Sequence, residues 1–267
     1  MPRACPTCGA NLGDVCPSCR ANLDDPVTLL TERVAYWFFR LNGCLTIENF
    51  IVHPDFGDGG SGQRTEADLI GVRFPDRHED LTRPMKDHPV LTVSRHRPLL
   101  FFTEVTLKQC KLNGPWRDPS RGNMQRVLRS IGMHTEDEIP TVAQALYSSR
   151  RFSGSSSEVR MFAVGDKDTG FANTYPGAVS LTWDQMLSFM FTRFRNYRNQ
   201  KQYNSQWDDV GRRLYELAVN RQDRQDFVET TRLLLRNSIG GKLEPRPTSF
   251  GRARSVSGSG YKSDSRR

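Results

Sequence analysis

The sequence lacks several patterns that mark common protein classes. It contains no run of eighteen apolar residues, and its first twenty residues have no continuous apolar stretch like that of a secretory signal peptide. A P-loop and a GxSxG nucleophile elbow are also missing. These absences predict an intracellular, cytoplasmic protein with no membrane partner, and they leave P-loop nucleotide hydrolysis and serine-esterase chemistry without support.

The hydrophobic content and the charge divide the chain unevenly. Hydrophobic residues make up 36% of the 267 residues, which is enough for a sizeable core. The segment 242–267 alone holds +5 of the net charge of +8. This segment is rich in Ser, Gly and Arg and has few large apolar groups, so we expect residues 241–267 to form a disordered basic tail. The tail either adds non-specific attraction to nucleic acid or contributes solubility.

Cysteine is concentrated at the start of the chain. The phrase Cys-Pro-x-Cys-x-Ala-Asn-Leu occurs twice, so that Cys5, Cys8, Cys16 and Cys19 form the pattern CxxC-x7-CxxC. Four thiolates in two such pairs predict a closed tetrahedral Zn(II) site, and zinc would supply folding free energy to a segment too short for a core. A redox dithiol and unrelated cysteines are the alternatives. The segment 1–24 resembles the small zinc ribbons at the ends of many bacterial and archaeal proteins.

The two remaining cysteines differ from these four. Cys44 and Cys110 lie in apolar surroundings in the sequence. We therefore expect both to be buried thiols without a metal.

The predicted elements follow a recognisable order. Hydrophobic periodicity predicts a helix at 24–43, a helical pair at 123–132 and 137–147, a helix at 182–197 and a further pair within 206–237. Strands are predicted at 44–53, 64–75, 98–112 and 158–166, with a Gly-rich loop at 57–62 and a polar insertion at 76–97. This order predicts an α/β (α+β) fold for residues 25–240, and it resembles the αβββαβ core of the restriction-endonuclease-like, or PD-(D/E)XK, nucleases, here with extra C-terminal helices.

The resemblance implies a metal site on the second and third predicted strands. The strand TEADLI contains Asp68 and the strand FFTEVTLK contains Glu104. Two such carboxylates suit a hard cation such as Mg(II), which lowers the pKa of a bound water and neutralises charge on a phosphate. Glu32 matches the glutamate that many family members have on the first helix. Asp55 or Asp58, beside the Gly-rich loop, is a second choice of ligand.

One position departs from the family pattern. The family lysine normally stands two residues after the glutamate, but position 106 is threonine. Because side chains alternate along a strand, Glu104, Thr106 and Lys108 would share one face, so Lys108 is our candidate for a displaced catalytic lysine.

Basic residues near these elements are candidates for phosphate contacts. Trp116 either stacks on a base or packs over the edge of the sheet. Phe194 and Tyr197 have the spacing of a core stripe, which leaves only the arginines between them as contacts. The predicted nucleic-acid contacts are Arg117, Arg121, Arg193, Arg195 and Arg198.

Two functions follow from these observations. The first is a Mg-dependent endonuclease that hydrolyses DNA, in the bacterial or archaeal defence or restriction setting that the resemblance implies. The alternative is a nuclease-fold adaptor in which Thr106 marks lost chemistry. Such an adaptor would bind nucleic acid, or a partner protein through the zinc ribbon.

Overall fold

The computed structural model describes residues 29–53, 64–79, 83–92 and 96–240, with the side chains of 237–240 excepted. The predicted zinc ribbon at 1–24, the Gly-rich loop with Asp55 and Asp58, and the basic tail at 241–267 lie outside these ranges. The zinc site at Cys5, Cys8, Cys16 and Cys19 therefore stays a prediction from the sequence.

A six-stranded mixed sheet forms the centre of the described chain. Its strands are β1 (Leu45–Val52), β2 (Thr65–Arg73), β3 (Leu99–Val105), β4 (Arg151–Ser153), β5 (Glu158–Gly165) and β6 (Val179–Thr182). The order across the sheet is β1-β2-β3-β5-β4. β4 and β6 both pair with the edge of β5 that faces away from β3, β4 with its first residues and β6 with its last. β1, β2 and β3 form an antiparallel meander, whereas β5 runs parallel to β3 and β6 runs parallel to β5.

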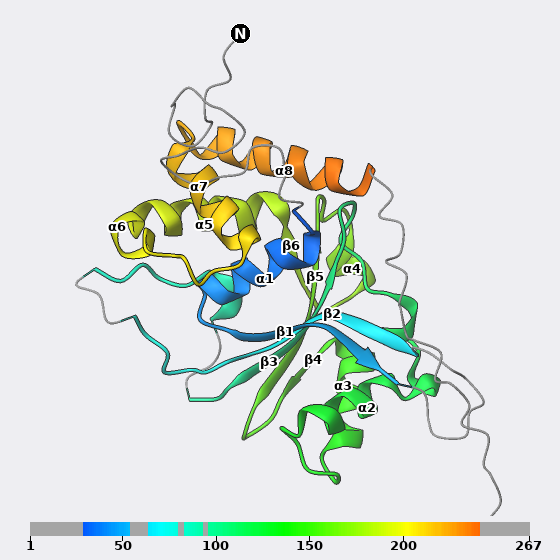
Figure 1. Cartoon of the computed structure of the whole chain (residues 1–267). Coiled ribbons are helices and arrows are strands. Elements are labelled where there is room, and N and C mark those ends of the chain that lie inside the picture. Colours follow the sequence, from blue (N-terminus) through cyan, green and yellow to red (C-terminus); the bar gives the residue numbers. More distant parts are fainter. Residues whose placement is uncertain (1–28, 54–63, 80–82, 93–95, 241–267) are drawn as a thin grey trace, which may run out of the picture.

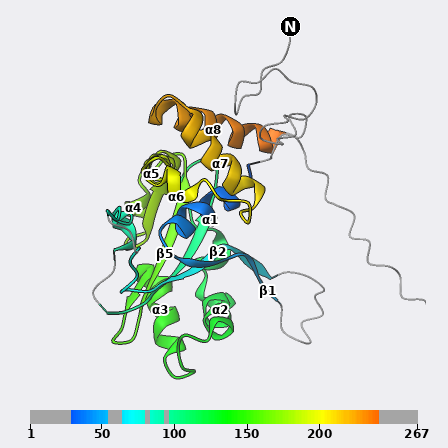
Figure 2. The same cartoon turned by 60° about the vertical axis from the view of Figure 1, so that its left-hand side comes forward.

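Helices cover both faces of this sheet. They are α1 (Thr31–Leu41), α2 (Asn123–Ile131), α3 (Ile139–Ser149), α4 (Phe171–Thr174), α5 (Trp183–Asn196), α6 (Arg198–Lys201), α7 (Asp209–Asn220) and α8 (Arg224–Gly240). Single 3-10 turns occur at Pro89–Leu91, Gly114–Trp116 and Pro119–Arg121. α1, α5, α7 and α8 lie on one side of the sheet and α2 and α3 on the other (Figure 1), and the turned view in Figure 2 shows the same two layers.

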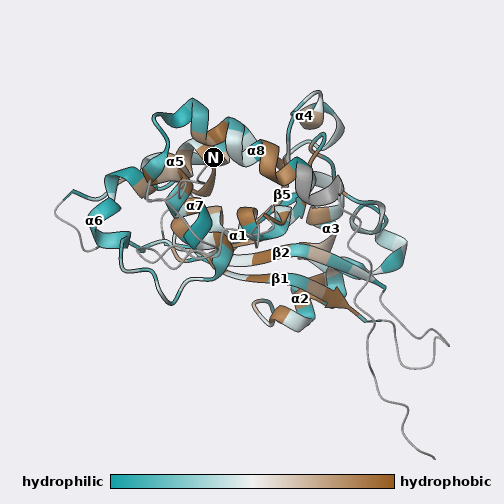
Figure 3. Ribbon diagram, turned by 45° about the horizontal axis from the view of Figure 1, so that its top comes forward, coloured by the Kyte–Doolittle hydropathy of each residue, from teal (hydrophilic) through white to brown (hydrophobic). Residues whose placement is uncertain are grey.

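The sheet separates two apolar clusters. Alternate side chains of β3 enter opposite clusters: Phe101 stacks on Phe39 of α1 with ring centroids 4.5 Å apart, while Phe102 packs with residues of α2 and α3. Every residue of β3 is buried, as its continuous apolar start predicts for a central strand. In Figure 3 the strands and α1 carry apolar stretches, whereas the short helix α6 is hydrophilic.

A close contact fixes α1 against the C-terminal helices. The Trp37 indole Nε1 donates a hydrogen bond to Asp208 Oδ1 at 3.0 Å, and Asp208 also caps the start of α7 by accepting from the Gly211 amide at 2.8 Å. A Cβ atom at Gly211 would lie 1.9 Å from the Trp37 ring, so only glycine leaves room for the indole at this position.

The mixed α/β class, the three-strand meander and the following helices agree with the sequence prediction. The first helix is shorter in the described chain than predicted, because it begins only at Thr31. Gly43, with φ +71°, follows its C-cap as expected. The short strands β4 and β6 were not predicted.

Two further predictions concern the buried cysteines and membrane-spanning helices. Cys44 and Cys110 are both buried free thiols, as expected, and burial raises the pKa of Cys44 to about 12 and that of Cys110 to about 11. Within the part of the chain that the structure describes, no helix combines the length and the apolar character needed to cross a membrane.

Candidate active site

The strand register brings Asp68 and Glu104 together. In the antiparallel pair of β2 and β3, Leu69 lies opposite Thr103, and one step further in the same register places Asp68 opposite Glu104. Side chains at opposed positions of antiparallel strands project from the same face, with Cβ atoms about 5 Å apart. Asp68 Oδ2 accepts a hydrogen bond from the Val105 amide at 2.6 Å, which ties this carboxylate to the end of β3.

The carboxyl group of Glu104 is buried without full hydrogen bonding. Glu104 is 3% exposed, and its Oε2 atom has no hydrogen-bond partner among the described residues. Burial, followed by the charge of Asp68, raises the pKa of Glu104 to about 8, although the Trp116 indole and the Asn113 backbone act in the opposite direction. The Trp116 Nε1 atom is itself buried and has no hydrogen-bond partner in the described chain. A buried acceptor without a partner is commonly explained by a catalytic role or by a bound water or ion.

The carboxyl group of Asp68 also has a raised pKa and no cation among the causes of the shift. Burial raises its pKa to about 6, the hydrogen bond from Val105 lowers it, and the charges of Glu32 and Glu66 raise it further. The charged side chains that shift the pKa values of Asp68 and Glu104 are therefore all carboxylates. Four acidic residues from α1, β2 and β3 thus act on one another without a guanidinium or ammonium group among them.

The two carboxylates fit a hard divalent cation. Mg(II) binds oxygen ligands, keeps several waters, and commonly uses only one or two carboxylates of a protein. The predicted third ligand, Glu32, is close enough to influence Asp68, but its Oε2 accepts a hydrogen bond from Thr31 Oγ1 at 2.9 Å. Among the described residues, no three His, Cys, Asp or Glu side chains lie close enough together to hold a metal ion. The arrangement therefore presents a pair of carboxylates and a more distant acid.

The prediction that Lys108 shares a strand face with Glu104 is wrong. β3 ends at Val105, so the alternation that would place Lys108 on the face of Glu104 does not extend to position 108. The chain bends there because Thr106 Oγ1 accepts a hydrogen bond from the Lys108 amide at 3.1 Å, and the Trp183 indole donates to the Thr106 carbonyl at 2.9 Å. The exposed Lys108 lines a separate cavity with Asp166 and Lys167.

The predicted arginine contacts divide into two groups. Arg193 is fully buried and pairs with Glu79 and Asp87, so it cannot also contact nucleic acid, and this prediction is wrong. Arg195 is exposed and donates to the Val219 carbonyl at 3.2 Å. The others are exposed, which leaves them as predicted contacts: Arg117, Arg121 and Arg198.

The aromatic side chains serve as packing groups. Trp116 is 1% exposed and lies in the cluster under α2 and α3, which supports packing over base stacking. Phe194 and Tyr197 are buried, as expected for a core stripe.

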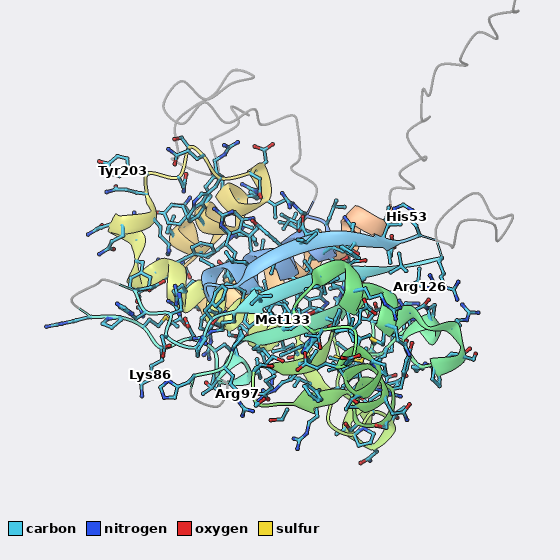
Figure 4. All side chains as sticks on the ribbon, turned by 90° about the horizontal axis from the view of Figure 1, so that it is seen from below. His53, Lys86, Arg97, Arg126, Met133 and Tyr203 are labelled. Carbon is cyan, nitrogen blue, oxygen red and sulfur yellow. The ribbon has the colours of Figure 1, made fainter. Side chains whose placement is uncertain are left out.

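Figure 4 shows how basic side chains are distributed at the edges of the molecule. Arg126 of α2 lies on the same side of this view as His53, the residue after β1, whereas Lys86 and Arg97 lie toward the other side.

Sequence reasoning missed a buried ion-pair network beside α5. Arg193 Nη1 lies 2.9 Å from Glu79 and Arg193 Nη2 lies 2.8 Å from Asp87, which also pairs with Arg73 at 2.7 Å and Arg77 at 2.8 Å. The signal available in the sequence is weak: the insertion at 76–97 mixes acids such as Glu79 and Asp87 with a few apolar residues such as Leu91, and nothing local links these acids to Arg193.

The chain has no match among protein-family models, curated proteins or solved structures.

Proposed function

We propose that the protein is a Mg-dependent nuclease that hydrolyses phosphodiester bonds of DNA at Asp68 and Glu104. The observation that supports this most is the pair formed by the buried Glu104 and the half-buried Asp68, whose pKa values are both raised and which have no cation among the causes of those shifts. Folding alone gains nothing from two buried acids with raised pKa values, because each must give up hydration without gaining a cation. A bound divalent cation would supply that missing charge.

The chain's own residues have distinct roles in this proposal. Asp68 and Glu104 would hold the ion, and Val105 holds Asp68 in place through its amide. Mg(II), when bound, lowers the pKa of a water and neutralises charge on the phosphate. The buried position of Glu104 excludes bulk water from one side of the site, which strengthens electrostatic interactions there. The expected bacterial or archaeal defence or restriction setting belongs to the same proposal.

The test is cleavage of supercoiled plasmid and of linear single- and double-stranded DNA. Wild type is incubated with Mg(II), with Mn(II) or with chelator, beside Glu104→Gln and Asp68→Asn. We expect metal-dependent cutting that falls at least about 100-fold in either variant, since such an ion supplies several kcal/mol of charge stabilisation. Glu136→Gln, which removes an exposed carboxylate paired with Arg129, is the matched control and should cut like wild type.

One observation favours the alternative of a nucleic-acid-binding or protein-binding adaptor. No lysine or arginine contributes to the pKa shifts of Asp68 and Glu104, and Lys108 lies beyond the end of β3. An adaptor would bind DNA or a partner without a metal-dependent product. DNA binding by a folded protein that cuts no substrate with either metal would therefore decide for the adaptor.

A further inference from the structure

A second candidate site lies beyond the end of β3, the strand that carries Glu104. A cavity of about 420 Å³ is lined by Leu107, Lys108, Gln109, Asp166, Lys167 and Arg236. Its walls come from the segments that directly follow β3 and β5, and from α8. The cavity is therefore at the carboxyl ends of parallel strands, which is where open α/β sheets commonly bind ligands.

The backbone walls of this cavity are closely joined. The Thr106 amide donates to the Val164 carbonyl at 3.0 Å, and the Cys110 amide donates to the Lys167 carbonyl at 2.9 Å. A Cβ atom at Gly165 would lie 2.5 Å from the Cys110 nitrogen, so glycine is needed for the two segments to approach this closely. Lys108 and Lys167 are thus held on two segments whose separation is fixed by backbone hydrogen bonds.

The charge of the cavity is positive. Its single carboxylate, Asp166, is already paired with Arg232, and with Arg236 at 3.4 Å. Within the described part of the chain, neither Lys108 nor Lys167 forms an ion pair through its ammonium group. Two unpaired ammonium groups around a cavity favour an anionic ligand, and a phosphate accepts from lysine as from a point charge.

We propose that this cavity binds a phosphate group of the nucleic-acid backbone, at a short distance along the strand from the bond held at Asp68 and Glu104. Four residues separate Glu104 from Lys108, so their Cα atoms are at most about 14 Å apart. The two side chains add up to about 10 Å, and phosphates of one strand recur about every 3.4 Å of helix axis, so the bound phosphate lies within about seven nucleotides of the active site. This inference rests on the proposed function for its choice of ligand.

The test measures DNA binding in the full-length protein without cleavage. A fluorescent 20-nucleotide single strand and the matching duplex are titrated in chelator over a range of salt concentrations. The variant is Lys108→Gln/Lys167→Gln, and the control is Arg151→Gln/Arg224→Gln, which also removes two exposed, unpaired cations, one on β4 at the start of β5 and one at the start of α8.

We expect the lysine variant to bind about tenfold more weakly than the control, the loss typical of one hydrogen-bonded charged contact. The slope of log K against log salt should fall by about 0.7 for the single strand and about 0.9 for the duplex. Equal affinities and slopes in the lysine variant and the control would overturn the proposal.

The remaining outcomes separate this inference from the proposed function. Lysine-dependent DNA binding without metal-dependent cleavage would retain the phosphate site while the nuclease proposal fails. If wild type binds no DNA, calorimetric titration with inorganic phosphate decides: binding lost in the lysine variant identifies a site for free phosphate instead of the DNA backbone. The absence of binding to either probe would overturn the phosphate site altogether.

Discussion

Two clusters of carboxylates in this protein differ in how their negative charge is balanced. Arg193, with no exposed surface, lies between Glu79 and Asp87 beside α5. Asp68 of β2 and Glu104 of β3 have only other acids among the charged groups that shift their pKa values. Burial acts to raise the pKa of Glu79, but hydrogen bonding from Arg77 and the charge of Arg193 lower it overall, whereas the pKa of Glu104 rises to about 8.

This difference separates a structural cluster from a functional one. In the network around Arg193 each carboxylate meets a guanidinium, so the buried charges stabilise the positions of the polar insertion and α5. In the acidic pair hydrogen bonds offset only part of the desolvation, so the pKa values of both carboxyl groups stay raised. The three predictions below test the comparison by altering first the compensated cluster and then the uncompensated one.

The largest effect on stability is expected from Arg193→Met. The substitution removes the buried guanidinium and leaves Glu79 with Arg77 alone and Asp87 with Arg73 and Arg77. Losing this buried partner should lower the free energy of unfolding by about 3–5 kcal/mol. Urea unfolding followed by circular dichroism measures this change. Arg129→Gln, which breaks the exposed pair with Glu136, is the control and should change stability by less than about 1 kcal/mol. A similar small change for both variants would contradict the structural role of Arg193.

Glu104→Gln should raise the free energy of unfolding relative to wild type as the pH increases, whereas Arg193→Met lowers it. The pKa of Glu104 is raised from 4.5 to about 8 in the folded protein, so the folded state holds a proton that the unfolded state releases. Wild-type stability should therefore fall as the pH rises from about 5 to about 8.5, while the variant is spared this loss. The free energy of unfolding of Glu104→Gln, relative to wild type, should increase by about 3–4 kcal/mol over this range.

Urea unfolding of both proteins at pH 5, 7 and 8.5 tests this pH dependence. Arg129→Gln, measured in parallel, corrects for effects of pH that do not involve the acidic pair. A constant difference between Glu104→Gln and wild type at all three pH values would show that Glu104 is not held protonated by its surroundings.

The smallest effect is expected from adding a divalent cation. Ca(II) or Mg(II) at about 100 times its dissociation constant should stabilise wild type by about 2.7 kcal/mol. The gain should be larger at pH 8.5 than at pH 6, because the ion must displace the proton of Glu104. Thermal unfolding with and without metal measures the shift. Glu104→Gln should show little of it, and an equal shift in that variant would place the cation elsewhere in the chain.

Much of the sheet could be predicted from the sequence, because local patterns determine it. The continuous apolar start of β3 identified a central strand, and the position of Asp68 and Glu104 on adjacent strands followed from the element order. Their direct opposition depends on the register. The alternation of apolar residues restricts it, but the long connection from Arg73 to Leu99 gives no turn that would fix it.

The errors arose where distant contacts decide the structure. The letters from Glu104 to Lys108 continue a strand pattern, but the carbonyl of Thr106 bonds to Trp183, 77 residues away, and the strand ends at Val105. Arg193 stands at helical spacing between Phe189 and Tyr197, but the acids that pair with it lie 114 and 106 residues earlier, where no local pattern links them to it. The short strands β4 and β6 depend on pairing with β5, so their few residues give little signal.

The contact between Trp37 and α7 has a consequence for the order in which the protein is made. The indole of Trp37 bonds to Asp208, 171 residues later in the chain, and fits against Gly211. Synthesis proceeds from the N-terminus, so α1 leaves the ribosome well before α7. The side of α1 that contacts α7 is therefore covered only after α7 has been made. Until then Trp37 stays exposed to other chains, so the last helices act during synthesis as the closing step for the first one.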